Sequence, residues 1–404
     1  MNKLTAIIFC VMIVACQQQA KYPKGIEHVV VIGLDGLSST GFRASATPFM
    51  DSMLHHGAYS YTVRCILPTV STPNWNAMLC GAGPEATGAI NNSWKANDFN
   101  FPYPVMSKDR SFPNIFRIIR EQKPDAELGA IYHWRGFRNM LEDALLNRSE
   151  TYPSQPETAQ KSAEYILEKK PHFLFIQLDE IDHAGHEDGH MSPGYLKCIE
   201  ETDAHVRLIA DAVQQAGIAD RTLIMVVGDH GGIFLGHGGN AYDELTTPII
   251  FFGRGVKQNY QIQQQIYKYD VAADVAFALG LKAPQVWTGR PTKPAYAGFD
   301  EPDNLWKEWE VLPSPRFASE TYKAPFGGEF VDRATVAILP PEGTEGVIRY
   351  TTDESTPTAE STVYNEPFTV ETTTVVNAKM FSDKGESVKV MAVYKITDGK
   401  GKEK

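Results

Sequence analysis

Three apolar, β-branched segments of strand length each lead directly into acidic residues, and this arrangement constrains the fold most. HVVVIGL ends at Asp35, HFLFIQLDE precedes Asp182 and His186, and TLIMVVG ends at Asp229 and His230. Continuous apolar runs of this kind are typical of strands buried on both faces of a parallel sheet. Ligands of open α/β sheets bind where the carboxyl ends of the strands meet. We therefore expect the acidic residues and histidines to gather at one edge of a sheet.

The residue types at these strand ends are those that hold divalent cations. Carboxylate oxygens mixed with histidine nitrogens suit zinc or a similar ion. His237 follows shortly after Asp229 and His230, and Ser71, in the segment PTVSTPNW, supplies a hydroxyl group. The pattern predicts a metal-assisted hydrolase.

Strand-like and helix-like segments alternate from about residue 27 to residue 287. This alternation predicts an α/β domain with a doubly wound, mostly parallel sheet. The expected strands are 28–34, 126–133, 172–178, 222–228 and 247–253, and the expected helices are 47–56, 113–121, 158–169, 193–216 and 271–279.

The pattern changes after about residue 290. Residues 291–326 are rich in proline and aromatic residues with little periodicity, which predicts a linker. Short alternating runs over residues 327–397 predict a small antiparallel β-sandwich of immunoglobulin-like style. We therefore expect a catalytic domain at 27–290, this linker, the sandwich, and a disordered tail at 398–404.

The first residues have the form of an export signal. Lys3 precedes TAIIFCVMIVA, a run too short to span a bilayer. The end of this run and the glutamines after Cys16 resemble a bacterial lipoprotein signal in which Cys16 is acylated; the alternative is an ordinary secretory signal. We expect a signal peptide at 1–16, a tether at 17–26, and an exported lipoprotein of the outer membrane, on its periplasmic face or at the cell surface.

Charge and cysteine content exclude some classes of protein. A net charge of −11 without a basic stripe argues against a nucleic-acid duplex as partner. It does not exclude a phosphate substrate, because bound cations can invert the local field. The cysteines include no CxxC pair, which excludes a cysteine-rich metal site. Cys65 and Cys80 either form a disulfide or are two buried thiols.

The order and spacing of these motifs resemble the alkaline phosphatase superfamily, and within it the type I phosphodiesterase and nucleotide pyrophosphatase branch. The resemblance covers roughly residues 29–290. It is carried by Asp35-Gly36, by Thr47-Pro48 with Asp51, by Pro68 to Asn74, by Asp182 with His186, and by Asp229-His230-Gly231.

This resemblance implies two divalent metal ions, most simply Zn²⁺. One ion would be held by Asp35, Ser71, Asp229 and His230, and the other by Asp182, His186 and His237. In the eukaryotic nucleotide pyrophosphatases the last histidine comes much later in the chain. The glycines around His237 would allow the close approach that a ligand needs.

The resemblance also places the nucleophile at Ser71. A serine hydroxyl is a poor nucleophile at neutral pH, and coordination to a dication would lower its pKa. Attack on phosphorus would give a phosphoseryl intermediate, which water then hydrolyses. Thr69 and Thr72 are alternatives by chemistry alone. A helix that begins near Thr72 would add amide donors, and Asn74 would donate to a phosphoryl oxygen.

The choice of ester depends on the residues around the nucleophile. Trp75 stands where the sulfatase signature has arginine, which disfavours a sulfatase. Trp134 and Arg135 are the candidate substrate-binding residues, although Arg135 could equally form a surface salt bridge. An aromatic cleft of Trp75, Trp94, Tyr132 and Trp134 would favour a phosphodiester or nucleotide. The alternative on the same site is a phosphomonoesterase, for which Arg135 would clamp the dianion.

The C-terminal segment resembles the small β-sandwich appended to chitobiase and related glycan-active enzymes. The matching elements are Arg349 to Asp353 and Pro357 to Tyr364. Such a domain would be a structural support or would contact glycan. A second alternative is therefore a glycan-binding surface lipoprotein with a silent hydrolase fold.

Overall fold

The computed structural model describes residues 22–96, 103–106, 111–305, 312, 314–318, 327–341 and 344–400. The expected signal peptide, with Cys16, and the last four residues of the expected tail lie outside these ranges. Among the residues described, no helix has the length and apolar character needed to cross a membrane.

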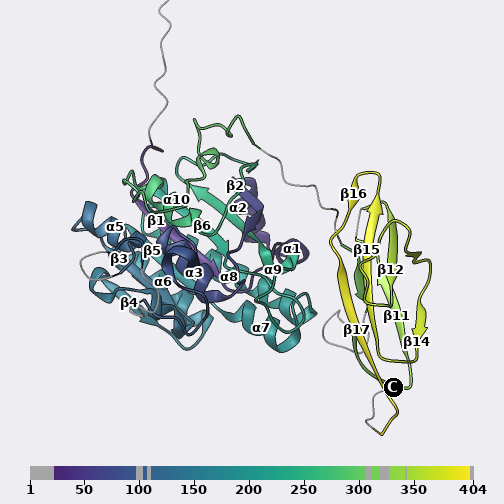
Figure 1. Cartoon of the computed structure of the whole chain (residues 1–404). Helices are drawn as coiled ribbons and strands as arrows, with labels where there is room; N and C mark the ends of the chain where they lie inside the picture. The colour runs from purple at the N-terminus through teal and green to yellow at the C-terminus, as the bar shows by residue number, and fades with distance from the viewer. Residues whose placement is uncertain are drawn as a thin grey trace, which may run out of the picture.

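The large domain is built on an eight-stranded sheet (Figure 1). Five neighbouring strands run parallel, and β7 runs antiparallel to both of its neighbours. The order across the sheet is β4 (Arg148–Thr151), β3 (Leu128–Tyr132), β5 (Phe173–Leu178), β1 (His28–Leu34), β6 (Thr222–Gly228), β7 (Thr246–Gly253), β2 (Gly57–Arg64) and β8 (Tyr260–Gln261).

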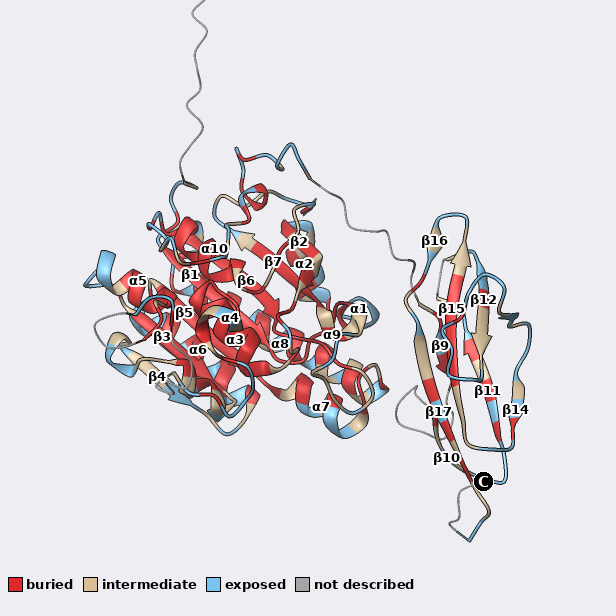
Figure 2. Cartoon of the chain, in the orientation of Figure 1, coloured by how far each residue is buried: buried red, intermediate tan, exposed pale blue. Residues whose placement is uncertain are grey.

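Helices cover both faces of this sheet, because alternate strand residues point to opposite sides. Val29 and Val31 of β1 pack with one set of helices, whereas Val30 and Ile32 pack with the other. The first set is α3 (Ser71–Cys80), α5 (Ile115–Gln122) and α10 (Asp270–Ala278), and the second is α2 (Pro48–His55), α6 (Gln155–Lys169) and α8 (Pro193–Gln215). Figure 2 shows the buried residues concentrated along the central strands and the helices against them. The predicted doubly wound, mostly parallel α/β fold is confirmed.

Shorter helices complete the large domain. They are α1 (Ser39–Ala44), α4 (Pro84–Thr87), α7 (Glu180–Asp188), α9 (Tyr242–Leu245) and the 3₁₀ turns η1 (Arg135–Met140), η2 (Asp143–Leu145), η3 (Ala219–Arg221) and η4 (Lys293–Ala295).

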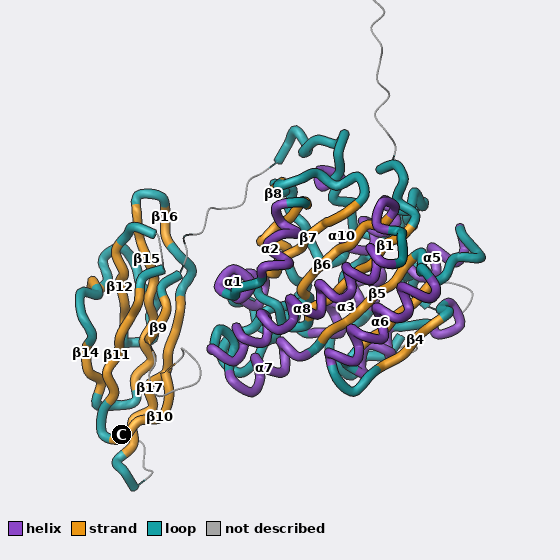
Figure 3. Tube along the Cα trace, turned by 180° about the vertical axis from the view of Figure 1, so that it is seen from behind, coloured by secondary structure: helices purple, strands orange, loops and turns teal. Residues whose placement is uncertain are grey.

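The C-terminal domain consists of strands and loops in the residues described (Figure 3). One sheet has the order β10 (Gly327–Val331), β17 (Val390–Thr397), β15 (Thr374–Ser382), β12 (Val347–Thr351) and β13 (Thr362–Val363), with β16 (Gly385–Glu386) on β15. The other contains β14 (Phe368–Val370), β11 (Ala334–Leu339) and β9 (Arg316–Ala318). The two share one apolar core, which confirms the predicted sandwich. It departs from a fully antiparallel arrangement where β10 pairs in parallel with β17, and at the isolated parallel bridge between Leu312 and Ser387.

Segments expected to be connectors contribute to these two cores. Ile26, from the expected tether, is buried with the large domain, as are Tyr296 and Phe299 from the expected linker. At the other end of that linker, β9 pairs with β11 of the sandwich. Apolar side chains in proline-rich stretches are therefore used for packing at both ends of the segment 291–326.

Cys65 and Cys80 are both free and buried. Burial raises the pKa of the Cys65 thiol to about 12, and it also raises the pKa of Cys80. Of the two alternatives left open by the sequence, the structure has the pair of buried thiols.

One close approach links the centre of the sheet to α3. A Cβ atom on Gly33 would lie 2.5 Å from Cζ3 of Trp75, so only glycine leaves room for the indole ring against β1. From this position the Trp75 Nε1–H donates to Oδ2 of Asp35 at 3.1 Å. The packing of α3 on β1 thus fixes a side chain at the end of the strand.

We expect Gly33→Ala to lower the free energy of unfolding by about 1–3 kcal/mol, as overpacking of a close-packed core does. Urea unfolding of the metal-free chain would measure this. Gly236→Ala is the matched control, because a Cβ atom there meets nothing within 4 Å. Equal unfolding midpoints for both variants would contradict the steric argument.

Candidate metal centre

The acidic strand ends meet because β5, β1 and β6 are neighbours in the sheet. Asp35 directly follows β1 and Asp229 directly follows β6, while Asp182 lies in α7, which begins just after β5. Ser71 is the first residue of α3, His186 lies in α7 with Asp182, and the segment after β6 carries His230 and His237. All seven residues expected to bind metal therefore come to the same edge of the sheet.

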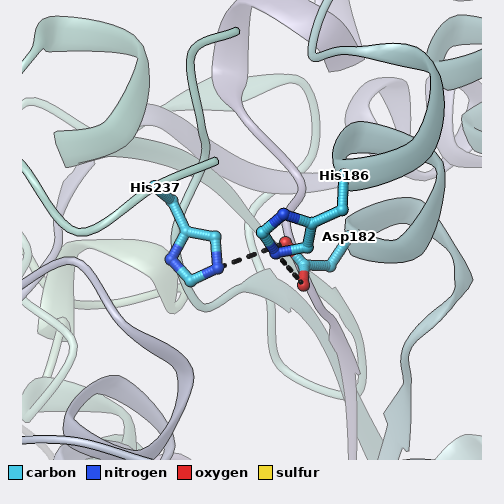
Figure 4. A group of neighbouring side chains, drawn as sticks. All are labelled: Asp182, His186 and His237. Carbon is cyan, nitrogen blue, oxygen red and sulfur yellow. Dashed lines mark ion pairs between the residues drawn. The ribbon is translucent and has the colours of Figure 1, made fainter. Parts of the chain in front are cut away.

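Two overlapping groups have the spacing of metal ligands. Asp182, His186 and His237 form one group, with side-chain atoms within 4.8 Å of one another (Figure 4). Nε2 of His186 lies 3.3 Å from Oδ2 of Asp182, and Nε2 of His237 lies 3.6 Å from its Oδ1. The second group is Asp35, Asp182 and His230.

His230 connects the second group to Asp229 and to the candidate nucleophile. Its Nε2 lies 3.5 Å from Oδ1 of Asp35, 3.3 Å from Oδ2 of Asp229 and 3.2 Å from Oγ of Ser71. The shared ion expected for Ser71 and His230 predicts that the two residues lie close together, and the structure brings them into contact. His230 and His237 also stack, with ring centroids 3.8 Å apart.

The three imidazoles are held in the same way. Nδ1 of each is within hydrogen-bond distance of a backbone carbonyl, which makes it the donor: His186 to Leu235 at 2.7 Å, His230 to Gly231 at 2.9 Å and His237 to Thr69 at 2.9 Å. This leaves Nε2 of each ring facing the carboxylates. Histidine ligands of metal ions are oriented by such bonds to the other ring nitrogen.

The carboxylates show a complementary division. Oδ2 of Asp35 accepts from Trp75 and Gln177, and Oδ1 of Asp229 accepts from the backbone of Gly36 and His230. Among the described residues, Oδ1 of Asp35, Oδ2 of Asp229 and Oδ1 of Asp182 are buried without a hydrogen-bond partner. Buried, unpaired carboxylate oxygens are costly, and bound cations would satisfy them. The donor set of carboxylates and imidazoles fits zinc-like ions.

Burial sets the protonation of the groups at the centre. It raises the pKa of Asp229 to about 8, and together with the charge of Asp229 it raises that of Asp35 well above the usual range. Burial, reinforced by His237, lowers the pKa of His230 to about 3. Burial alone would also raise the pKa of Asp182, but its hydrogen bond with His186 and the nearby histidines lower it overall. His230 is therefore neutral, the form that ligates metal.

Gly185 lies between Asp182 and His186, and a glycine at this place in the sequence predicts a loop. This prediction is wrong. Both lie in α7, where a spacing of four residues places them on one face of the helix. Gly185 serves packing instead of a turn: a Cβ atom there would lie 2.5 Å from the ring of His190.

Asn74 does not have the position expected for a phosphoryl donor. Its side chain is fully buried; Oδ1 accepts from Ile66 N at 2.7 Å, and Nδ2 donates to Val70 O at 2.9 Å. The amide thus supports the loop before α3 and has no free donor for a ligand. Asn92 instead accepts the Thr72 N–H at 2.9 Å, which places an exposed amide beside Ser71. The sequence carried no signal for Asn92.

The expected aromatic cleft is mostly core. Trp75, Trp94 and Tyr132 are buried, and only Trp134 is partly exposed. The backbone N–H of Trp134 donates to Gln177 at 2.9 Å, and Arg135 after it is exposed. These two residues remain the candidates for contact with a substrate.

Two comparisons with known sequences bear on the centre. The profile of the type I phosphodiesterase / nucleotide pyrophosphatase family matches residues 29–124 and 129–237, just over half of the chain. The chitobiase/beta-hexosaminidase C-terminal domain matches residues 325–392. Ectonucleotide pyrophosphatase/phosphodiesterase family member 3 of Bos taurus is 24% identical over 228 residues, which are 53% of this chain and 26% of the relative. GPI ethanolamine phosphate transferase 1 of Emericella nidulans is 24% identical over 273 residues, 59% of this chain and 29% of the relative.

Solved structures share the fold. Murine ectonucleotide pyrophosphatase / phosphodiesterase 5, in an inactive form in complex with AMP, has a TM-score of 0.54 at 16% identity and covers 64% of this chain and 96% of its own. A 2-O GAG sulfatase has a TM-score of 0.55 at 14% identity and covers 90% of this chain and 84% of its own. The chain spans about a quarter of the length of the curated relatives above.

We expect His237→Ala to weaken the binding of one of two zinc ions by more than roughly tenfold, a loss seen even when an outer-shell partner is removed. Elemental analysis after gel filtration would give the number of ions retained per chain. His56→Ala is the control, since His56 is exposed on α2 and bonds only within its own turn. An unchanged zinc stoichiometry in His237→Ala would mean that the last ligand lies elsewhere.

Proposed function

Because this chain belongs to the type I phosphodiesterase / nucleotide pyrophosphatase family, we propose that it is a two-metal phosphoric ester hydrolase that cleaves phosphodiesters or nucleotide pyrophosphates. One observation carries the proposal: Oγ of Ser71 lies 3.2 Å from Nε2 of His230, within a cluster that contains buried carboxylate oxygens with no hydrogen-bond partner among the described residues. A nucleophile and a set of cation ligands are thus adjacent.

The metal set proposed from the sequence is compatible with this geometry. Asp35, Ser71, Asp229 and His230 would hold one ion, and Asp182, His186 and His237 the other. Bound Zn²⁺ ions would lower the pKa of the serine hydroxyl and offset the charge of the phosphoryl group.

Ser71 is the proposed nucleophile. Its Oγ forms a bond to phosphorus as the bond from phosphorus to the departing ester oxygen breaks, and the proton that leaves the Ser71 hydroxyl is passed through solvent to that departing oxygen. Water then attacks the phosphoseryl group, which restores the Ser71 hydroxyl and releases a phosphate monoester. Net hydrolysis consumes one water molecule per ester bond.

The first turn of α3 supplies the donors for the phosphoryl oxygens. Pro73 has no N–H, and the N–H groups of Thr72 and Asn74 donate to Asn92 and Val70. The Ser71 N–H has no acceptor among the described residues. It lies at the N-terminus of α3, where anions are favoured. We propose that this N–H and the Asn92 amide take the role that the sequence assigned to Asn74.

Two alternative functions are each supported by a specific observation. A phosphomonoesterase is the second candidate, because Arg135 is exposed beside Trp134 and has no ion pair among the described residues. The match of residues 325–392 to a chitobiase-type domain supports the proposal that the sandwich contacts glycan. A sulfatase is disfavoured, because Trp75, in place of the sulfatase arginine, is buried and donates to Asp35.

The proposal includes export as an outer-membrane lipoprotein anchored at Cys16. In bacteria that express the chain, we expect the wild type in the membrane fraction and Cys16→Ser in the soluble periplasmic fraction. Labelling with a clickable fatty acid would measure acylation directly. Cys198→Ser is the control for loss of a thiol elsewhere in the chain, and equal label on both variants would contradict anchoring at Cys16.

The substrate class is tested by the ratio of kcat/KM for bis(p-nitrophenyl) phosphate to that for p-nitrophenyl phosphate, on zinc-loaded protein that lacks residues 1–16. We expect a ratio of tenfold or more, about 1.4 kcal/mol of differential transition-state binding. A tenfold preference for the monoester would support the phosphatase and assign Arg135 as the clamp.

Ser71→Ala is the control for this measurement. We expect turnover of both esters to fall by at least roughly a thousandfold while zinc is retained, because the nucleophile is lost and most ligands stay. Activity within tenfold of the wild type would point to Thr72 or to direct attack by water. No turnover of either ester by the wild type would favour the glycan-binding alternative.

A further inference from the structure

A buried glutamine at the end of β5 connects the candidate metal centre to its surroundings. Gln177 lies between Ile176 and Leu178 in an apolar strand, and its side chain is fully buried. Its Oε1 accepts the backbone N–H of Trp134 at 2.9 Å. Its Nε2 donates to Oδ2 of Asp35 at 2.9 Å and to Oδ1 of Asp179 at 2.9 Å. Each of the two carboxylates thus accepts a hydrogen bond from the same amide group.

Asp179 extends this chain of hydrogen bonds to the surface. It is buried and outside the proposed metal set, and its second oxygen, Oδ2, lies 3.0 Å from Nε2 of His183. The His183 side chain is 63% exposed, and its ring lies 5.9 Å from that of His133. His133 immediately precedes Trp134 and Arg135, so His183 of α7 lies near the segment that carries the candidate substrate-binding residues.

We propose that Gln177 and Asp179 are positioning residues that hold Asp35 and His183 in one hydrogen-bonded unit, and that His183 contacts an anionic oxygen of the phosphate ester. The bond from Nε2–H to Asp179 favours the doubly protonated ring of His183, whose Nδ1–H then donates to the substrate. The substrate contact rests on the proposed function, whereas the support of Asp35 does not.

The geometry distinguishes this role from ordinary core packing. An apolar residue at position 177 would fill the same space, but it could not form the three hydrogen bonds of the Gln177 amide. One oxygen of Asp35, one oxygen of Asp179 and the N–H of Trp134 would each lose a hydrogen bond. Lost partners at buried polar groups disturb structure locally. We therefore expect the loss of these hydrogen bonds to displace the side chains of Asp35 and His183. Such a displacement is measured as weaker binding of metal and of ligand.

The chain contains a matched control for Gln177. Gln155 is also buried, its Oε1 accepts one backbone N–H, from Glu180, and its Nε2 bonds to the side chains of Thr202 and His205. It differs in having no contact with a proposed metal ligand. Gln177→Met and Gln155→Met therefore remove the same number of hydrogen bonds from equally buried positions.

The first measurement is the zinc affinity of the metal-stripped full chain, by competition with a chromophoric chelator. We expect Gln177→Met to weaken the tighter or the weaker site by 10- to 100-fold, the range typical of outer-shell partners, and Gln155→Met to stay within about threefold of wild type. Equal zinc affinities for the two variants would overturn the positioning role, whatever their unfolding midpoints. This comparison needs no turnover and stands even if the proposed function fails.

The second measurement is the binding of AMP to the zinc-loaded chain by calorimetry, together with kcat and KM for the diester. We expect His183→Gln to weaken AMP binding and raise KM by at least about fivefold with unchanged zinc affinity, which a purely structural effect on an exposed residue would not produce. His56→Gln should match the wild type. Unchanged AMP binding and KM in His183→Gln would overturn the contact. A wild type that neither binds AMP nor cleaves the diester would overturn the proposed function and this contact together.

Discussion

The large domain holds three buried carboxylates whose second oxygens have no hydrogen-bond partner among the described residues, and the remaining features of the centre depend on this condition. In Asp35 and Asp229 one oxygen is fixed by N–H donors, so neither side chain can rotate to satisfy the other. Burial raises the pKa values of both groups, and neighbouring carboxylates add to the increase. Divalent cations would resolve this conflict, and the imidazoles would complete their coordination.

The sheet order explains how distant segments supply one centre. β5, β1 and β6 are neighbours although α6 and α8 separate them along the chain, and each delivers its acidic group at the same edge. α3 reaches this edge from the opposite layer, where Trp75 packs over Gly33 and bonds to Asp35. The core of the domain and the orientation of a ligand are therefore parts of the same packing arrangement.

Elements with one strong physical signal could be predicted from the sequence. β1 and β6 are continuous β-branched runs and have the expected bounds. β4, with the polar sequence RSET at the sheet edge, and β2, with its mixed burial, carried no such signal. Side-chain direction was also beyond the sequence: nothing in it shows that Asn74 turns back on its own loop, or that Asn92 returns to Thr72.

One polar residue in the sequence indicates a buried hydrogen-bonding position, but it was not used in the prediction of the site. Gln177 interrupts the apolar run FLFIQL one residue before its end. A glutamine at that place must have partners for its amide, and the neighbouring strand end offers Asp35. The relation becomes visible only when the register of β1 with β5 is known.

The support of the three histidines has a consequence for how this centre can change over evolutionary time. Their Nδ1 atoms bond to carbonyl groups of Thr69, Gly231 and Leu235, and every amino acid possesses that group. The Leu235 side chain is exposed, so its identity can drift while the carbonyl group still orients His186. Thr69 is less free, because its hydroxyl group bonds to the backbone of Gly238 and Gly239 beside His237. The orientation of the histidines is thus inherited mainly through the backbone, whereas that of Asp35 depends on the side chains of Trp75 and Gln177.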